Sequence, residues 1–67
     1  MKLTYNNYKI TFVNGKQRNI RCSTTLEAYC DSILFAMANA WEPAITEMLE
    51  VETGKIFYPK TILNEKN

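Results

Sequence analysis

Residues 24–41 read TTLEAYCDSILFAMANAW and carry the pattern of one long amphipathic helix. Thr24 and Glu27 match a capping box, in which the threonine hydroxyl accepts a hydrogen bond from the third-residue amide and the glutamate reaches back. Pro43 disfavours helical geometry at Glu42, so the helix is predicted to end near Trp41. On a helical wheel the apolar residues fall within an arc of about 140°. This arc is predicted to face the core and contains Leu26, Tyr29, Cys30, Ile33, Leu34, Met37, Ala40 and Trp41.

A β-hairpin is predicted before this helix. Residues 3–13 alternate apolar and polar side chains with the period of two of a half-buried strand, and residues 17–22 form the returning strand. The Asn14-Gly15 pair between them is a strong hairpin signal. The residues predicted to face the core are Tyr8, Ile10, Phe12, Ile20 and Cys22.

The register of this hairpin follows from its apolar residues, because directly opposed residues of an antiparallel pair share a face. A two-residue turn would pair Ile10 with Asn19 and place the two apolar sets on opposite faces. A three-residue turn over residues 14–16 pairs Ile10 with Ile20 and Tyr8 with Cys22. The sequence therefore predicts a three-residue or bulged turn with Gly15 in the left-handed region.

A second hairpin is predicted after Pro43. Residues 44–52 place Ile45, Leu49 and Val51 on one parity, Thr53-Gly54 forms a turn, and residues 55–58 return as a short strand. A two-residue turn pairs Val51 with Ile56 and Leu49 with Tyr58, so this hairpin needs no bulge.

The order β-β-α-β-β predicts an α+β fold, a two-layer ββαββ sandwich with a four-stranded, mainly antiparallel sheet and one helix packed on one face. The order of the strands in the sheet stays open. The domain is expected to span residues 1–59, and residues 60–67 to form a polar C-terminal tail in which Ile62 and Leu63 can pack locally. This layout is common among small bacterial and phage open reading frames, which suggests a phage or mobile-element origin but indicates no function.

The composition argues against catalysis. The 67-residue chain has no histidine, which removes the most common general base and the imidazole metal ligand. Both glycines fall in predicted turns, so there is no glycine-rich phosphate loop. A core of this size leaves little room for a dry pocket of about 300 Å³ or more. We therefore expect a protein that is not an enzyme and that binds no cofactor, metal or small-molecule substrate.

The two cysteines, Cys22 and Cys30, are expected to be reduced in a cytoplasmic protein, because no secretion leader opens the sequence. A disulfide is the alternative, since Cys22 ends a predicted strand and Cys30 lies on the facing side of the predicted helix. Two thiols without an imidazole give poor support for zinc. No segment approaches the roughly 18 consecutive apolar residues of a membrane span, so no membrane association is expected.

Charge is divided sharply along the chain. Residues 1–23 carry five basic residues and no acid, residues 24–53 carry six acids and no base, and residues 54–67 carry three lysines and one glutamate, which sums to the net charge of +1. One interpretation is a basic hairpin that binds nucleic acid or another polyanion through Lys9, Lys16, Arg18 and Arg21. The simpler interpretation is that basic and acidic strands lie side by side and neutralise each other.

The helix face opposite the predicted core is unusual, because residues 32–41 carry no charge. On this face Phe35 stands among small residues, which is typical of a surface that pairs with another protein or with a second copy. The alternative is that the C-terminal tail covers Phe35. We favour a non-catalytic interaction module, a homodimer or a small adaptor or inhibitor. Phe35 would be its anchor, with Ala28, Ser32 and Asn39 around it and Asp31 at the rim.

Overall fold

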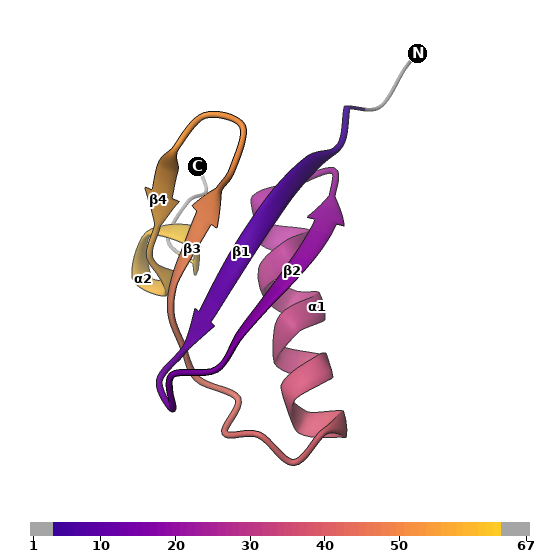
Figure 1. Ribbon diagram of the computed structural model, residues 1–67, viewed down its shortest axis with the longest axis vertical. Helices are drawn as coiled ribbons and strands as arrows, with labels where there is room; N and C mark the ends of the chain where they lie inside the picture. Colours follow the sequence, from indigo (N-terminus) through magenta and orange to yellow (C-terminus); the bar gives the residue numbers. More distant parts are fainter. Residues whose placement is uncertain (1–3, 64–67) are drawn as a thin grey trace.

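Six elements make up the part of the chain that the computed structural model describes, residues 4–63. In chain order they are β1 (Asn6–Phe12), β2 (Gln17–Cys22), α1 (Thr25–Ala38), β3 (Ile45–Glu50), β4 (Lys55–Phe57) and α2 (Pro59–Leu63). All neighbouring strands are antiparallel, in the order β2-β1-β3-β4 (Figure 1). The predicted α+β fold with a four-stranded sheet and one main helix is therefore confirmed.

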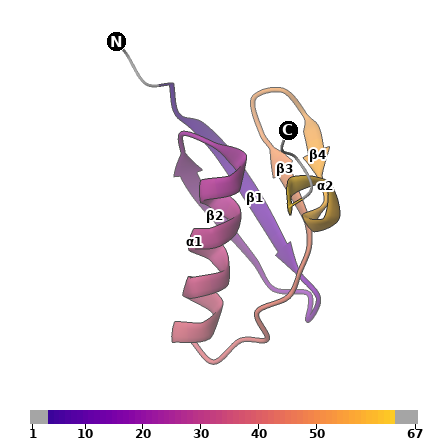
Figure 2. The same cartoon turned by 180° about the vertical axis from the view of Figure 1, so that it is seen from behind.

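Both helices cover the same face of the sheet. Helix α1 packs on β2 and β1, and α2 packs on β3 and touches α1 (Figure 2). The core between the layers takes most of its large side chains from the sheet, and the opposite face of the sheet is left uncovered by any described element. The buried apolar residues are Tyr8, Ile10, Phe12, Cys22, Ala28, Ala36, Ile45, Met48 and Ile62.

The turn of the first hairpin has the predicted length but a different position. Its three residues are 13–15, because the Phe12 amide donates to the Lys16 carbonyl oxygen at 2.8 Å. Tyr8 therefore pairs with Ile20, and Ile10 pairs with Arg18, so the predicted partners are wrong by two residues. The reason lies in Gly15, whose φ is +88°. A three-residue hairpin turn places its left-handed residue last, which fixes Gly15 as the third position.

The second hairpin also differs from the prediction. Leu49 pairs with Ile56 and Glu50 with Lys55, so four residues, 51–54, form the turn in place of two. The Thr53 hydroxyl holds this wider turn, because it donates to the Glu50 carboxylate at 3.0 Å and accepts from the Lys55 amide at 3.2 Å. A register shift opposite Thr11 and Phe12 then changes which residues of β3 face the core. The core side chains of β3 are Ile45 and Met48, so the prediction that Leu49 and Val51 share a face with Ile45 is wrong.

The predicted rotation of α1 is wrong. The residues of α1 that are buried are Ala28, Ser32 and Ala36, which follow one another at intervals of four. Five residues of the predicted core stripe are instead exposed, among them Leu26 at 50%, Leu34 at 64% and Met37 at 61%. Small residues on the helix face leave space for Tyr8 and Phe12, which rise from the sheet and are almost completely buried. The helix therefore packs its small face inward.

The cap that begins α1 is confirmed. The Thr24 hydroxyl accepts a hydrogen bond from the Glu27 amide at 3.0 Å. The Glu27 carboxylate accepts from the Ser23 hydroxyl at 2.8 Å and from the Ser23 amide at 3.2 Å. These bonds, the hydroxyl bond first, hold the pKa of Glu27 below its ordinary value.

The helix ends three residues before the predicted Trp41. The Trp41 amide donates to the Ala36 carbonyl at 2.8 Å and the Ala40 amide to the Met37 carbonyl at 3.3 Å, which is the bond pattern of a Schellman cap. Such a cap needs a left-handed residue, and Ala40 supplies it with φ +60°. The cap reverses the chain and returns Trp41 to the core.

Part of the expected C-terminal tail packs on the domain. Ile62 of α2 is buried in the core, as the expected local packing allows, whereas Leu63 is exposed. Residues 64–67 of that tail lie outside the described residues. Both cysteines are free, with Cys22 buried and Cys30 exposed, so the disulfide alternative is not formed. Burial raises the pKa of the Cys22 thiol.

Replacement of Ala40 by glycine should stabilise the protein. Glycine adopts a left-handed conformation without the steric cost that an alanine side chain meets, so Ala40→Gly should raise the free energy of unfolding by about 1 kcal/mol. Urea denaturation measures the change. Ala38→Gly, inside the last turn of α1, is the matched control and should lower the free energy by about 0.5–1 kcal/mol. Equal losses in both variants would contradict the assigned cap.

The Glu27 cap should make stability depend on acid pH. A carboxylate with a lowered folded-state pKa stabilises the native state above its unfolded-state pKa, and this contribution is lost as the pH falls through the folded-state pKa. The wild type should therefore exceed Glu27→Gln in stability at about pH 6, and the gap should narrow toward about pH 3. Urea midpoints at the two pH values measure it. A gap that stays constant would show that the charge of Glu27 plays no part.

Candidate functional site

Arg18 joins β2 to α1 and contacts three of the predicted interface residues, Asp31, Ser32 and Phe35. Its side chain is only 17% exposed, and its Nη1 lies 3.3 Å from the Asp31 carboxylate. The same nitrogen lies 3.5 Å from the hydroxyl oxygen of Ser32 and from the Asp31 carbonyl oxygen. The guanidinium carbon is 4.0 Å from the centre of the Phe35 ring, a cation–π distance. Arg18 thus binds the helix to the sheet edge.

Phe35, the predicted interface anchor, is part of an internal aromatic cluster. Its ring meets Trp41 edge to face at 5.2 Å, and Trp41 meets Phe12 in the same way at 5.3 Å. Lys16 lies 5.5 Å from the centre of the Trp41 ring. Such pairs stabilise a fold beyond the area they bury. Phe35 is therefore partly covered by Trp41 and Arg18.

Two residues of the predicted interface face of α1 lie on its inner face. Ala28 and Ser32 are fully buried against the sheet and offer no surface to a partner. Asp31 is exposed but bound to Arg18. Asn39 is exposed and caps the helix, with its side-chain amide donating to the Phe35 carbonyl at 2.8 Å. The prediction of an outward binding face is therefore wrong for Ala28 and Ser32, which the helix packs against the sheet.

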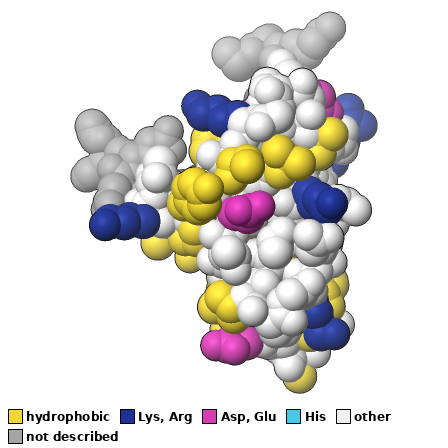
Figure 3. All heavy atoms as spheres, turned by 60° about the vertical axis from the view of Figure 1, so that its left-hand side comes forward, with side chains coloured by type: hydrophobic (Ala, Val, Ile, Leu, Met, Phe, Trp, Pro, Cys, Tyr) yellow, Lys and Arg dark blue, Asp and Glu magenta, His cyan; other side chains and the backbone are white. Residues whose placement is uncertain are grey.

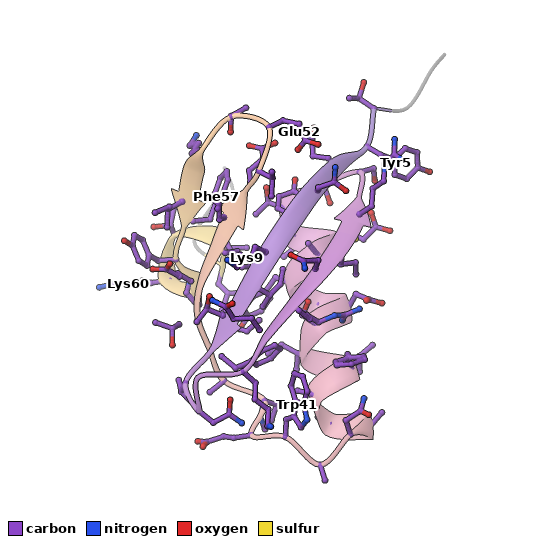
Figure 4. The ribbon with its side chains drawn as sticks, in the orientation of Figure 1. Tyr5, Lys9, Trp41, Glu52, Phe57 and Lys60 are labelled. Carbon is purple, nitrogen blue, oxygen red and sulfur yellow. The ribbon has the colours of Figure 1, made fainter. Side chains whose placement is uncertain are left out.

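The four basic residues of the alternative site lie apart from one another. Arg18 points toward α1, whereas Lys9 lies on the uncovered face of the sheet. Lys16 lies at the Trp41 end of the hairpin, and Arg21 lies near Tyr5, with its guanidinium carbon 5.9 Å from that ring. Figure 4 places Tyr5 and Trp41 at opposite ends of the molecule. These positions do not form one basic patch.

Acidic residues lie beside the basic hairpin. Strand β3 carries Glu47 and Glu50 and pairs with β1. Glu52, in the turn that follows, accepts from the Asn7 amide at 2.9 Å and from the Asn7 side chain at 2.6 Å. These bonds, the backbone bond first, lower the pKa of Glu52 below its ordinary value. The polyanion interpretation loses support, because acids neutralise much of the positive charge of the sheet.

The outer face of α1 is the strongest candidate surface. We define it as Leu26, Cys30, Ile33, Leu34 and Met37, which share one side of the helix at helical spacing. Next to it is an apolar hollow of about 410 Å³, lined by Tyr29, Cys30, Ile33, Leu34 and Pro43. Cys30, Ile33 and Leu34 belong to both. Sequence reasoning placed all of these helix residues inside the core and therefore missed the surface.

A smaller apolar band lies on the uncovered sheet face. It comprises Leu49, Val51 and Ile56, which the corrected register turns away from the helices. Figure 3 shows a band of hydrophobic side chains that crosses the surface, with lysine or arginine side chains around it. Lys9 pairs with Leu49 in the sheet. This mixed surface is less apolar than the outer face of α1.

Comparison of the chain with protein-family models, with curated proteins and with solved structures found no match. Within residues 4–63 no helix has the length and apolar character needed to cross a membrane.

Proposed function

We propose that the chain is a non-catalytic protein-interaction module that binds the apolar side of a partner helix on the outer face of α1. The observation that carries this proposal is the exposure of Leu26, Leu34 and Met37, each of which is at least half exposed on one side of a single helix. Contiguous apolar surface of this kind marks interaction sites in soluble proteins.

The geometry of the surface favours a helix as the partner. Apolar side chains in steps of three and four residues form the ridges between which a second helix packs. The hollow beside Leu34 offers a place for one large apolar side chain of that helix. Burying a leucine or methionine that is otherwise exposed contributes about 1.5–3 kcal/mol, so three such residues supply a useful affinity.

Charge supports the same type of partner. The outer face of α1 contains no charged residue, and no charge occurs anywhere in residues 32–41. A partner with an uncharged stripe avoids burying an unpaired charge, which is costly. A module of this kind would work as an adaptor or an inhibitor on a larger protein. The two unpaired thiols support a reducing, cytoplasmic setting.

Replacement of Leu34 by aspartate should abolish binding and preserve the fold. Leu34 is exposed, so the charge causes little strain in the free domain but would be buried unpaired in a complex. Affinity capture from lysate would compare the wild type with Leu34→Asp, and thermal unfolding would verify that the variant folds. Val13→Asp is the matched control, since Val13 is similarly exposed but lies in the turn of the first hairpin.

The proposal expects at least one protein that both the wild type and Val13→Asp retain and that Leu34→Asp loses. Sedimentation of the purified chain measures its oligomeric state and shows whether this partner is a second copy. Capture that is the same for all three proteins, or that disappears after nuclease treatment, would overturn the proposal.

A further inference from the structure

Strand β2 is an edge strand of six residues, Gln17–Cys22. It forms one border of the sheet, whereas the strand at the other border, β4, has only three residues. An edge strand presents unpaired backbone donors and acceptors along its free side. The side chains of Gln17, Asn19 and Arg21 are all exposed.

The backbone groups that point outward from β2 can be identified. The Phe12 amide bonds to Lys16, and the Val51 amide bonds to the Asn7 carbonyl on the other side of β1. In an antiparallel pair the groups of alternate residues point to opposite sides. The backbone N–H and C=O groups of the even-numbered residues of β1 therefore point toward β2, and the partners of those residues are Arg18, Ile20 and Cys22. It follows that the N–H and C=O groups of Gln17, Asn19 and Arg21 point away from the sheet, two residues apart.

The charge along this edge is positive. The hairpin turn and β2 carry Lys16, Arg18 and Arg21 and no acid. Among residues 4–63 the salt bridge that forms is Arg18–Asp31. Lys16 and Arg21, at the two ends of the strand, form no salt bridge within this range, although Lys16 lies over Trp41 and Arg21 lies near Tyr5 and within the electrostatic reach of Glu52.

We propose that the free edge of β2 is a docking site for an extended, acidic segment of another protein, which adds to the sheet as a fifth strand. Main-chain hydrogen bonds to Gln17, Asn19 and Arg21 would supply the affinity. Carboxylates of the docked segment near Lys16 and Arg21 would supply the preference for an acidic sequence. A second copy fits less well, since two paired β2 edges would bring Lys16 and Arg21 of each chain, neither held in a salt bridge, along one seam. This surface is separate from the outer face of α1, so either proposal can fail alone.

Replacement of Asn19 by proline tests the edge directly. The Asn19 N–H points outward, so proline removes a docking bond without removing a bond to β1, and proline is tolerated at such edge positions. Asn19→Ala, which keeps the amide, is the matched control. The probe is a fluorescein-labelled, end-blocked peptide of seven alternating glutamate and valine residues, and its anisotropy is followed at low and at high salt.

Wild type and Asn19→Ala should bind this peptide alike, and Asn19→Pro should bind it about tenfold more weakly. Binding should weaken as salt rises, and a lysine–valine peptide should not bind. If the proline variant is unfolded, amide exchange of the wild type decides instead: the peptide should protect the amides of Gln17, Asn19 and Arg21.

Several outcomes would overturn the proposal. They are no binding to the wild type at low salt, equal binding by Asn19→Pro, and equal binding of the lysine peptide. Binding of a single-stranded oligonucleotide that Asn19→Pro leaves unchanged would show a polyanion site in place of a strand-docking edge. A dimer that Asn19→Pro dissociates would show that a second copy occupies the edge. The Leu34→Asp variant should bind the peptide normally, which separates this test from that of the helix face.

Discussion

The close packing of a small-residue helix face on a sheet of large side chains determines the rest of this structure. Ala28, Ser32 and Ala36 lie against Tyr8 and Phe12, so the space between the layers is filled mainly from the sheet. Protein interiors are densely packed, and larger residues at these three helix positions would push the layers apart. Arg18 and the Phe12–Trp41–Phe35 cluster then hold the helix at this distance and in this rotation.

The parts of the fold that local rules govern could be predicted from the sequence. Strand alternation places Tyr8, Ile10 and Phe12 in the core, Thr24 caps the helix, and Gly15 is left-handed. Both hairpin registers were wrong by two residues. In the first hairpin this error preserves the face of every side chain, because the strand period is two. In the second, the shift opposite Thr11 and Phe12 changes the parity of β3, and the sequence alone does not indicate it.

The rotation of α1 could not be predicted from hydrophobicity. For the same reason the outer face of α1 could not be recognised as a candidate site. A helical wheel favours burial of the widest apolar arc, which contains Leu26, Leu34 and Met37. The limited space between the helix and the sheet favours burial of the small helix face, because the sheet already supplies the large side chains. The small residues at 28, 32 and 36 were a readable signal of close packing between layers. The sequence interpretation assigns two of these residues, Ala28 and Ser32, to a binding surface, whereas the structure packs them against the sheet and exposes Leu26, Leu34 and Met37. This packing leaves a charge-free apolar stripe in contact with solvent, on which the proposed function depends.

The two cysteines report the rotation of α1 directly. Cys30 is exposed if the small face of α1 points inward, and it would be buried, like Cys22, in the opposite rotation. Cys22 is buried and Cys30 belongs to the outer face of α1. The most direct measurement is the reaction of the native protein, at low concentration, with a maleimide of sufficient size to be resolved by mass spectrometry. We expect rapid labelling of Cys30 and protection of Cys22 until the protein unfolds. Protection of Cys30, or labelling of both thiols at equal rates, would contradict this expectation.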